Sequence, residues 1–140
     1  MIRRPPRSTH CISSAASDVY KRQVQSNFYS ALAGFIDQGE SIEEAVRREV
    51  QEESQVNVGR VQYHSSQPWP FPSSLMIGCH ALAVSTEIVV NSSEMANVSW
   101  FSKEEVIASL NNQHPELTVT GRMAIAHHLI KSWAEGEVQF

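Results

Sequence analysis

Carboxylates are concentrated in one short segment of this chain of 140 residues, between Gly34 and Val56. Glu49, Glu52 and Glu53 are separated by three and four positions, so on a helix they share one face. Like charges this close repel each other, and a hard cation such as Mg²⁺, which takes oxygen ligands, reverses that effect. The spacing therefore indicates a metal site, and the alternative is a solvated acidic helix face.

These carboxylates need a helix to position them, and the sequence predicts one from about Ser41 to about Ser54. Ser41 and Glu44 have the spacing of a capping box at its start. An apolar stripe would dock the helix on a core. Its members are Ile42, Ala45, Val46 and Val50.

The loop and helix together resemble the Nudix box of nucleoside-diphosphate-X hydrolases. The matching positions are Gly34, Glu40, Arg48, Glu49, Val50, Glu52, Glu53 and Val56. Gln55 stands where the family pattern has glycine. A glycine there would end the helix in the left-handed conformation, which costs another residue about 1–2 kcal/mol. We expect Asn57 or Gly59 to end the helix instead, slightly displaced, without loss of metal binding.

A second motif runs from Ser66 to Met76 and reads Ser-Gln-Pro-Trp-Pro-Phe-Pro-Ser-Ser-Leu-Met. Its alternating prolines predict an extended loop at the sheet edge, which cannot join a central strand. The alternatives are a structural turn and a ligand for a proline-binding module. The motif also resembles the signature of the NADH pyrophosphatase branch, which implies a substrate loop. Its contact residues would be Gln67, Pro68, Trp69, Pro70, Phe71, Pro72, Ser73 and Ser74.

The resemblance implies an α/β (α+β) fold, the Nudix α/β/α sandwich with a mixed sheet. It also implies hydrolysis of NADH, and less efficiently NAD⁺, to AMP and nicotinamide mononucleotide. Mg²⁺ or Mn²⁺ would bind Glu49, Glu52, Glu53 and Glu94, although Glu94 could instead be a surface turn acid.

Two further residues complete the implied catalytic set. Glu40 would tune the metal shell or the attacking water, and Arg48 would orient a carboxylate through a bidentate pair. By the same resemblance, three residues join the loop as substrate contacts: Ala33, Phe35 and Ala126.

Apolar patterns predict the remaining elements: a buried strand over Leu75–Val84 and helices over Ser102–Leu110 and Arg122–Trp133. His127 and His128 cannot share a helix face, so we expect one exposed and one partly packed histidine and assign them no role. Cys79 lies in the apolar strand, where a reduced core cysteine is expected.

The first 23 residues differ in charge from the rest of the chain. They hold five of the eleven Lys and Arg residues and one of the fifteen Asp and Glu residues, which leaves a net charge of −8 on the remainder. This segment resembles translated adapter sequence, and a mitochondrial presequence is the alternative. We therefore divide the chain into a non-native or disordered leader, 1–23, and a Nudix domain, 24–140.

We expect that domain to be truncated at its N-terminus. Its sheet would lack its first strand or strands and have an unpaired edge. We expect the zinc ribbon of the family, which lies upstream of this domain, to be missing as well.

The sequence is compatible with more than one substrate and function class. The NAD cap on RNA presents the same pyrophosphate as NADH, and a non-catalytic nucleotide-binding remnant is the alternative from another class. We expect a homodimer, no membrane partner, and a peroxisomal or cytoplasmic location, with mitochondria as the alternative.

Overall fold

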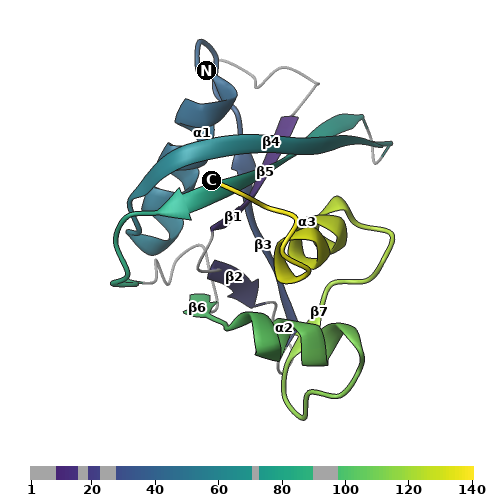
Figure 1. Ribbon diagram of the computed structural model, residues 1–140. Coiled ribbons are helices and arrows are strands. Elements are labelled where there is room, and N and C mark those ends of the chain that lie inside the picture. The colour runs from purple at the N-terminus through teal and green to yellow at the C-terminus, as the bar shows by residue number, and fades with distance from the viewer. Residues whose placement is uncertain (1–8, 16–18, 23–27, 71–72, 90–97) are drawn as a thin grey trace.

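The structure is a computed structural model that describes residues 9–15, 19–22, 28–70, 73–89 and 98–140 (Figure 1). Its elements, in chain order, are β1 (Thr9–Ala15), β2 (Val19–Arg22), β3 (Phe28–Phe35), α1 (Ile42–Ser54), β4 (Val58–Trp69), β5 (Ser74–Ala83), β6 (Val98–Trp100), α2 (Lys103–Leu110), β7 (Thr118–Val119) and α3 (Ile125–Ala134).

The strands form one mixed sheet in the order β4-β5-β1-β3-β2-β6, and β7 pairs with β3. Strand β1 runs parallel to β5, and β7 runs parallel to β3. The other described pairs are antiparallel. The predicted mixed sheet is therefore confirmed.

Alternation along β3 separates the helices onto two faces of the sheet, because successive strand residues point to opposite sides. Leu32 packs in one core cluster with Val46 and Val50 of α1. Its neighbour Ala31 packs in another cluster with Leu129 of α3. Helices α1 and α3 thus cover opposite faces, which gives the predicted α/β/α sandwich (Figure 1).

Two of the strands, β1 and β2, lie within the first 23 residues. We expected the loss of upstream strands to leave an unpaired edge in the sheet. Instead, β1 pairs with β3 on one side and with β5 on the other, so that position in the sheet is filled. The foreign origin of the leader stays a prediction.

The proline-rich motif lies at the sheet edge, as expected, but it does not begin as a loop. Pro68 and Trp69 are the last residues of β4, opposite Leu75 and Ser74 of β5. An edge strand tolerates proline because one side of its backbone needs no donor for a neighbouring strand. The strand predicted over Leu75–Val84 is confirmed by β5, whose bounds differ by one residue at each end.

Helix α1 begins as predicted, since Ser41 caps it and both hydrogen bonds of the capping box with Glu44 are present. The prediction for its end is wrong. Gln55 itself takes the left-handed conformation, with φ 59° and ψ 12°, and its N–H donates to the Gln51 carbonyl at 2.9 Å. The helix therefore ends without displacement, and a glutamine sits in the conformation that suits glycine.

The two later helices, α2 and α3, lie where the apolar patterns predicted helices. Helix α2 begins at a second capping box, between Ser102 and Glu105, and confirms the prediction. Helix α3 begins at Ile125, three residues later than predicted. The residues before it form a turn in which the Ala124 N–H donates to the Gly121 carbonyl at 3.2 Å, and Ala124 is extended.

Cys79 is buried in the core cluster beneath α1, where a core cysteine was predicted. None of the helices in the described ranges has the length and apolar character needed to cross a membrane.

The left-handed helix end predicts that Gln55→Gly stabilises the protein. Relief of backbone strain outweighs the extra freedom that glycine gives the unfolded chain, so the free energy of unfolding should rise by about 0.5–1 kcal/mol. Urea unfolding measures the change. The matched control is Gln51→Gly inside the same helix, which should lower stability by about 1 kcal/mol. A loss of stability in both variants would contradict the assignment of strain to Gln55.

Candidate functional site

Arg48 lies at the centre of the carboxylate cluster. Its Nε and Nη2 donate to the two carboxylate oxygens of Glu40 at 2.5 and 2.9 Å, which is the bidentate pair expected for this arginine. Its Nη1 donates to Glu49 Oε1 at 2.9 Å and to Glu52 Oε2 at 3.2 Å. A single guanidinium thus joins the loop carboxylate to two carboxylates of α1.

Main-chain groups at the end of β3 hold the same cluster. The Phe35 carbonyl accepts from Arg48 Nη2 at 2.9 Å, and the Phe35 N–H donates to Glu49 Oε1 at 3.1 Å. The Asp37 N–H donates to Glu40 Oε2 at 2.9 Å. Our sequence reading missed these contacts, because residue types carry no signal for backbone donors and acceptors. The only feature of the sequence that points to a contact between the loop and the helix is the fixed number of residues between Gly34 and that helix.

Gly34 lies directly against the Glu49 side chain, so a side chain at this position would displace the Glu49 carboxylate. A Cβ atom built on this residue would overlap the Cδ and Oε2 atoms of Glu49. Gly34 is buried, and only its missing side chain leaves room for the Glu49 carboxylate against the backbone. The carboxylate is thereby fixed in position by the shape of the strand as well as by its hydrogen bonds.

Electrostatics in the cluster favour the charged forms. The hydrogen bond from Arg48, followed by that from the Asp37 N–H, lowers the pKa of Glu40 from 4.5 to about 2. The same bond to Glu40 is the main cause that raises the pKa of Arg48 above its ordinary value. Both groups are therefore ionised at neutral pH.

The carboxylates of α1 offer the oxygen donors that a hard divalent cation prefers. Glu49 is partly exposed, Glu52 is about half exposed, and Glu53 is buried with 5 % exposure. As arranged, however, no three Asp, Glu, His or Cys side chains of the described residues form a group that could hold a metal ion. Arg48 bonds two of the three glutamates instead, so it supplies the positive charge in this arrangement. Glu94 lies outside the described residues.

Two of the three predicted substrate contacts outside the loop meet on the other face of the sheet. Ala126 of α3 is buried in the cluster formed with Ala31 and Leu129, and Ala33 packs against that cluster. Phe35, the third, is partly buried, and its backbone contacts the carboxylate cluster. Two neighbouring parts of β3 therefore serve the two groups of site residues. Ala33 belongs to the apolar contacts, and the backbone of Phe35 contacts the carboxylate cluster.

The predicted substrate loop is the tip of the β4–β5 hairpin. Pro68 is exposed and Trp69 partly buried at the end of β4, and Pro70 begins the turn. Ser73 is exposed and Ser74 begins β5. Phe71 and Pro72 lie outside the described residues.

Gln67 has a structural contact that the sequence did not reveal. Its side-chain Nε2 donates to the Met123 carbonyl at 2.8 Å, and its Oε1 accepts from the Ile125 N–H at 2.9 Å. Ala124, the N-cap of α3, provides no capping side chain, so Gln67 satisfies a helix N–H from a distant strand. This amide connects the hairpin to the start of α3.

The two adjacent histidines match their prediction. His127 is partly buried and its Nδ1 lies 2.9 Å from the Thr120 carbonyl, whereas His128 is exposed.

Comparison with known proteins adds an independent finding. The family model of the NUDIX domain matches residues 16–120. The chain is 49% identical over 129 residues to the NAD-capped RNA hydrolase NUDT12 of Macaca fascicularis, covering 91% of this chain and 27% of that protein. It is 44% identical over 139 residues to the mitochondrial NAD(P)H pyrophosphatase NUDT13 of Homo sapiens, covering 91% and 38%. This chain thus spans well under half the length of these curated relatives.

Among solved structures, the fold is similar to that of a NUDIX hydrolase from Nitrosomonas europaea. The TM-score is 0.69, and the match covers 96% of this chain and 74% of the other. Sequence identity is only 15%, so this likeness concerns the fold alone.

The lowered pKa of Glu40 predicts a pH-dependent contribution to stability. The pKa falls from 4.5 to about 2 on folding, so the contribution is fully present above about pH 4.5 and is lost as the pH falls through about 2. Urea unfolding at a series of pH values should show that the stability difference between the native protein and Glu40→Gln shrinks over this window. Gln38→Ala, in the same loop, adds no titrating group and should show a constant difference.

The contact of Gln67 predicts that Gln67→Leu loosens the start of α3. Loss of the cap leaves the Ile125 N–H unsatisfied, which should lower the free energy of unfolding by about 1–2 kcal/mol. Amide hydrogen exchange at Ile125 should accelerate, and urea unfolding measures the stability. Gln62→Leu, at an exposed position of the same strand, is the matched control. Unchanged exchange at Ile125 would show that the cap does not hold the helix.

Proposed function

Because this chain belongs to the NUDIX domain family, whose model matches residues 16–120, we propose that it hydrolyses the pyrophosphate of nicotinamide dinucleotides. The substrates are NADH and, less efficiently, NAD⁺. Water attacks one phosphorus, the bridging P–O bond breaks, and the products are AMP and nicotinamide mononucleotide, which is reduced when NADH is the substrate.

The observation that carries this proposal is the cluster of glutamates held at the end of β3. Hydrolysis of a pyrophosphate develops negative charge on phosphate oxygens, and the central demand is to supply compensating positive charge there. In this cluster the Glu49 carboxylate is fixed against Gly34 and bonded to the Phe35 N–H, which leaves it little freedom to reorganise. Such fixed carboxylates suit a divalent metal.

We assign the metal, Mg²⁺ or Mn²⁺, to Glu49, Glu52 and Glu53, with Glu94 as a further ligand. The oxygen donor set and the cradle at Gly34 support this assignment. When bound, the metal would neutralise phosphate charge and lower the pKa of the attacking water.

Arg48 and Glu40 have positioning roles in this proposal. Arg48 would stay paired with Glu40 through its two-point contact, and a cation held by the glutamates would replace its bonds to Glu49 and Glu52. These two bonds are single contacts from one nitrogen, Nη1, and Glu52 is about half exposed, so they are weaker than the two-point pair. Arg48 thereby aligns α1 with the loop without contacting phosphate.

We assign the dinucleotide itself to the hairpin tip and to the apolar side of β3. The contacts would be Ala33, Phe35, Ala126 and the residues from Gln67 to Ser74. The hydrogen bonds of Gln67 to Met123 and Ile125 support a joint role for hairpin and helix, since they fix α3, which carries Ala126, relative to the hairpin. The aromatic rings of Phe35 and Trp69 suit stacking on a base or nicotinamide.

A second candidate substrate is the NAD cap on RNA, because it presents the same pyrophosphate and nicotinamide. The relative from Macaca fascicularis carries that activity in its name, which favours this candidate. Removal of the cap would use the same carboxylates and the same hairpin.

We further propose that residues 1–23 are a leader whose strands β1 and β2 pair with the sheet of the catalytic domain, residues 24–140. We propose that this domain acts as a homodimer. We favour the peroxisome or the cytoplasm as its location. The relative from Homo sapiens is named as mitochondrial, which supports mitochondria as the alternative.

The decisive experiment is release of AMP from NADH with and without Mg²⁺, for the native protein and Glu53→Gln. Loss of a buried ligand carboxylate should lower kcat/KM by at least about a hundredfold, whereas the exposed Glu104→Gln in α2 should leave it unchanged. Circular dichroism of each variant checks the fold.

Two other results would change the proposal. Nucleotide binding by the native protein without metal-dependent turnover would identify a non-catalytic remnant. A higher kcat/KM for NAD-capped RNA than for NADH would make the RNA cap the main substrate.

A further inference from the structure

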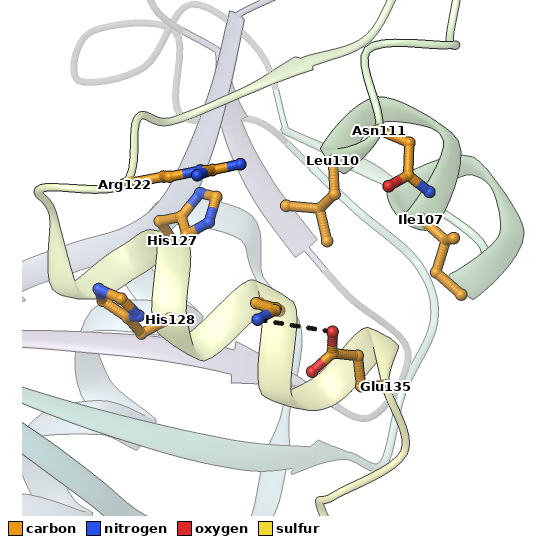
Figure 2. Close-up of a pocket in the computed structure, with 8 residues that line it drawn as sticks. Ile107, Leu110, Asn111, Arg122, His127, His128 and Glu135 are labelled. Atoms are coloured by element: carbon orange, nitrogen blue, oxygen red, sulfur yellow. Dashed lines mark ion pairs between the residues drawn. The ribbon is translucent and has the colours of Figure 1, made fainter.

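A pocket lies between α2 and α3 and is separate from the proposed catalytic residues (Figure 2). Its volume is about 400 Å³, within the range of small-molecule sites. In the described part of the chain, none of the residues that we assign to the metal or the dinucleotide lines it. The pocket is therefore a candidate for a second binding site.

Its charge is opposite to that of the surrounding chain. After residue 23 the chain carries a net charge of −8 and only six Lys and Arg residues. Two of these six, Arg122 and Lys131, line this one pocket together with two imidazoles and a single carboxylate, that of Glu135. The charges of this lining therefore favour a small anion over a cation.

Arg122 is available for such an anion. In the described part of the chain, its guanidinium takes part in no hydrogen bond or ion pair, and Figure 2 shows it beside His127 and pointing toward Leu110. A guanidinium presents a planar fork of donors that matches two oxygens of a phosphate. His127 sits beside it, and its ring is oriented by the hydrogen bond between Nδ1 and the Thr120 carbonyl.

The opposite wall of the pocket belongs to α2 and has a different chemistry. Ile107 is an exposed large apolar side chain, with 41% exposure, and Leu110 lies one turn further along the helix. Asn111 adds an amide that both donates and accepts. A flat ring with hydrogen-bonding edges would match this wall, while an inorganic anion alone would not use it.

Lys131 and Glu135 form an exposed ion pair at 3.7 Å, drawn as the dashed line in Figure 2. Both side chains are about half exposed, and pairs of this kind contribute little to stability. The ammonium can therefore turn from Glu135 to a stronger anionic partner in the pocket. Glu135 in turn opposes binding of that partner.

We propose that this pocket binds a small organic phosphate of nucleoside monophosphate size. The phosphate pairs with Arg122 and Lys131, and the base packs on Ile107 and Leu110 with its edge toward Asn111. This site goes beyond the proposed reaction, since it requires neither the metal nor turnover.

The experiment is an NMR titration of the full chain with AMP in the presence of EDTA, so that no metal is bound at the glutamate cluster. Amide shifts of Asn111, Arg122 and Lys131 should saturate together. Adenosine and inorganic phosphate, which each lack one half of the ligand, should bind at least about tenfold more weakly.

Three charge variants test the assignment of residues. Arg122→Gln should weaken AMP binding about tenfold, whereas the matched change Arg60→Gln, at an exposed position on β4, should leave it within about twofold. Glu135→Gln should strengthen binding about two- to threefold, because it removes the opposing charge and frees Lys131.

Four results would overturn the proposal. The first is that AMP saturates no pocket amide, and the second is equal loss of affinity in Arg122→Gln and Arg60→Gln. The third is that adenosine binds as tightly as AMP. The fourth is binding only of a 5′-phosphorylated oligonucleotide, which would assign the surface to RNA. Because turnover is not measured, these results are independent of the outcome for NADH hydrolysis.

Discussion

Mutual repulsion among carboxylates is the constraint on which the rest of the structure depends. Four glutamates come together at the start of α1 and along one of its faces, and Arg48 compensates three of them: Glu40, Glu49 and Glu52. Its contact with the Phe35 carbonyl also ties this charge to the sheet. The guanidinium therefore offsets the repulsion within a dense group of acids close to the end of β3. A metal would take over part of the role that the guanidinium has here.

The two halves of the proposed site are positioned by different faces of one sheet. The glutamates belong to α1, which packs over Leu32, whereas Ala33 and Ala126 belong to the face that α3 covers. The backbone at the end of β3 connects the two halves, since Phe35 bonds both Arg48 and Glu49. On the α3 side, the amide of Gln67 sets the distance between the hairpin and the helix. The geometry of a bound dinucleotide would thus depend on β3 and Gln67 together.

Three structural predictions made from the sequence were wrong, and each has a physical cause: the end of α1, the start of α3 and the place of Pro68. Gln55 ends α1 in the left-handed conformation because the packing of the helix and the following strand fixes its end, and this context outweighs the strain of one residue. Val56, which follows directly, is fully buried, so a later helix end would displace it from the core. Helix α3 starts at Ile125 because a distant strand, and no local residue, supplies its cap. Pro68 joins β4 because that strand lies at the sheet edge, and its place in the sheet order depends on the whole topology.

The sequence by itself determined the features that arise from neighbours along the chain. Capping boxes at Ser41 and Ser102, the helix that carries the glutamates and the strand around Cys79 all follow from local spacing, and the structure shows each of them. That strand is buried only at its centre, because Leu75 and Leu82 are exposed. Only the tertiary structure decided which backbone groups form hydrogen bonds with Arg48 and Glu49, that the Glu49 carboxylate lies where a side chain of residue 34 would be, and that a basic pocket lies between α2 and α3. The physical reason is that these contacts join residues far apart in sequence, and their partners are fixed only when the sheet and helices pack.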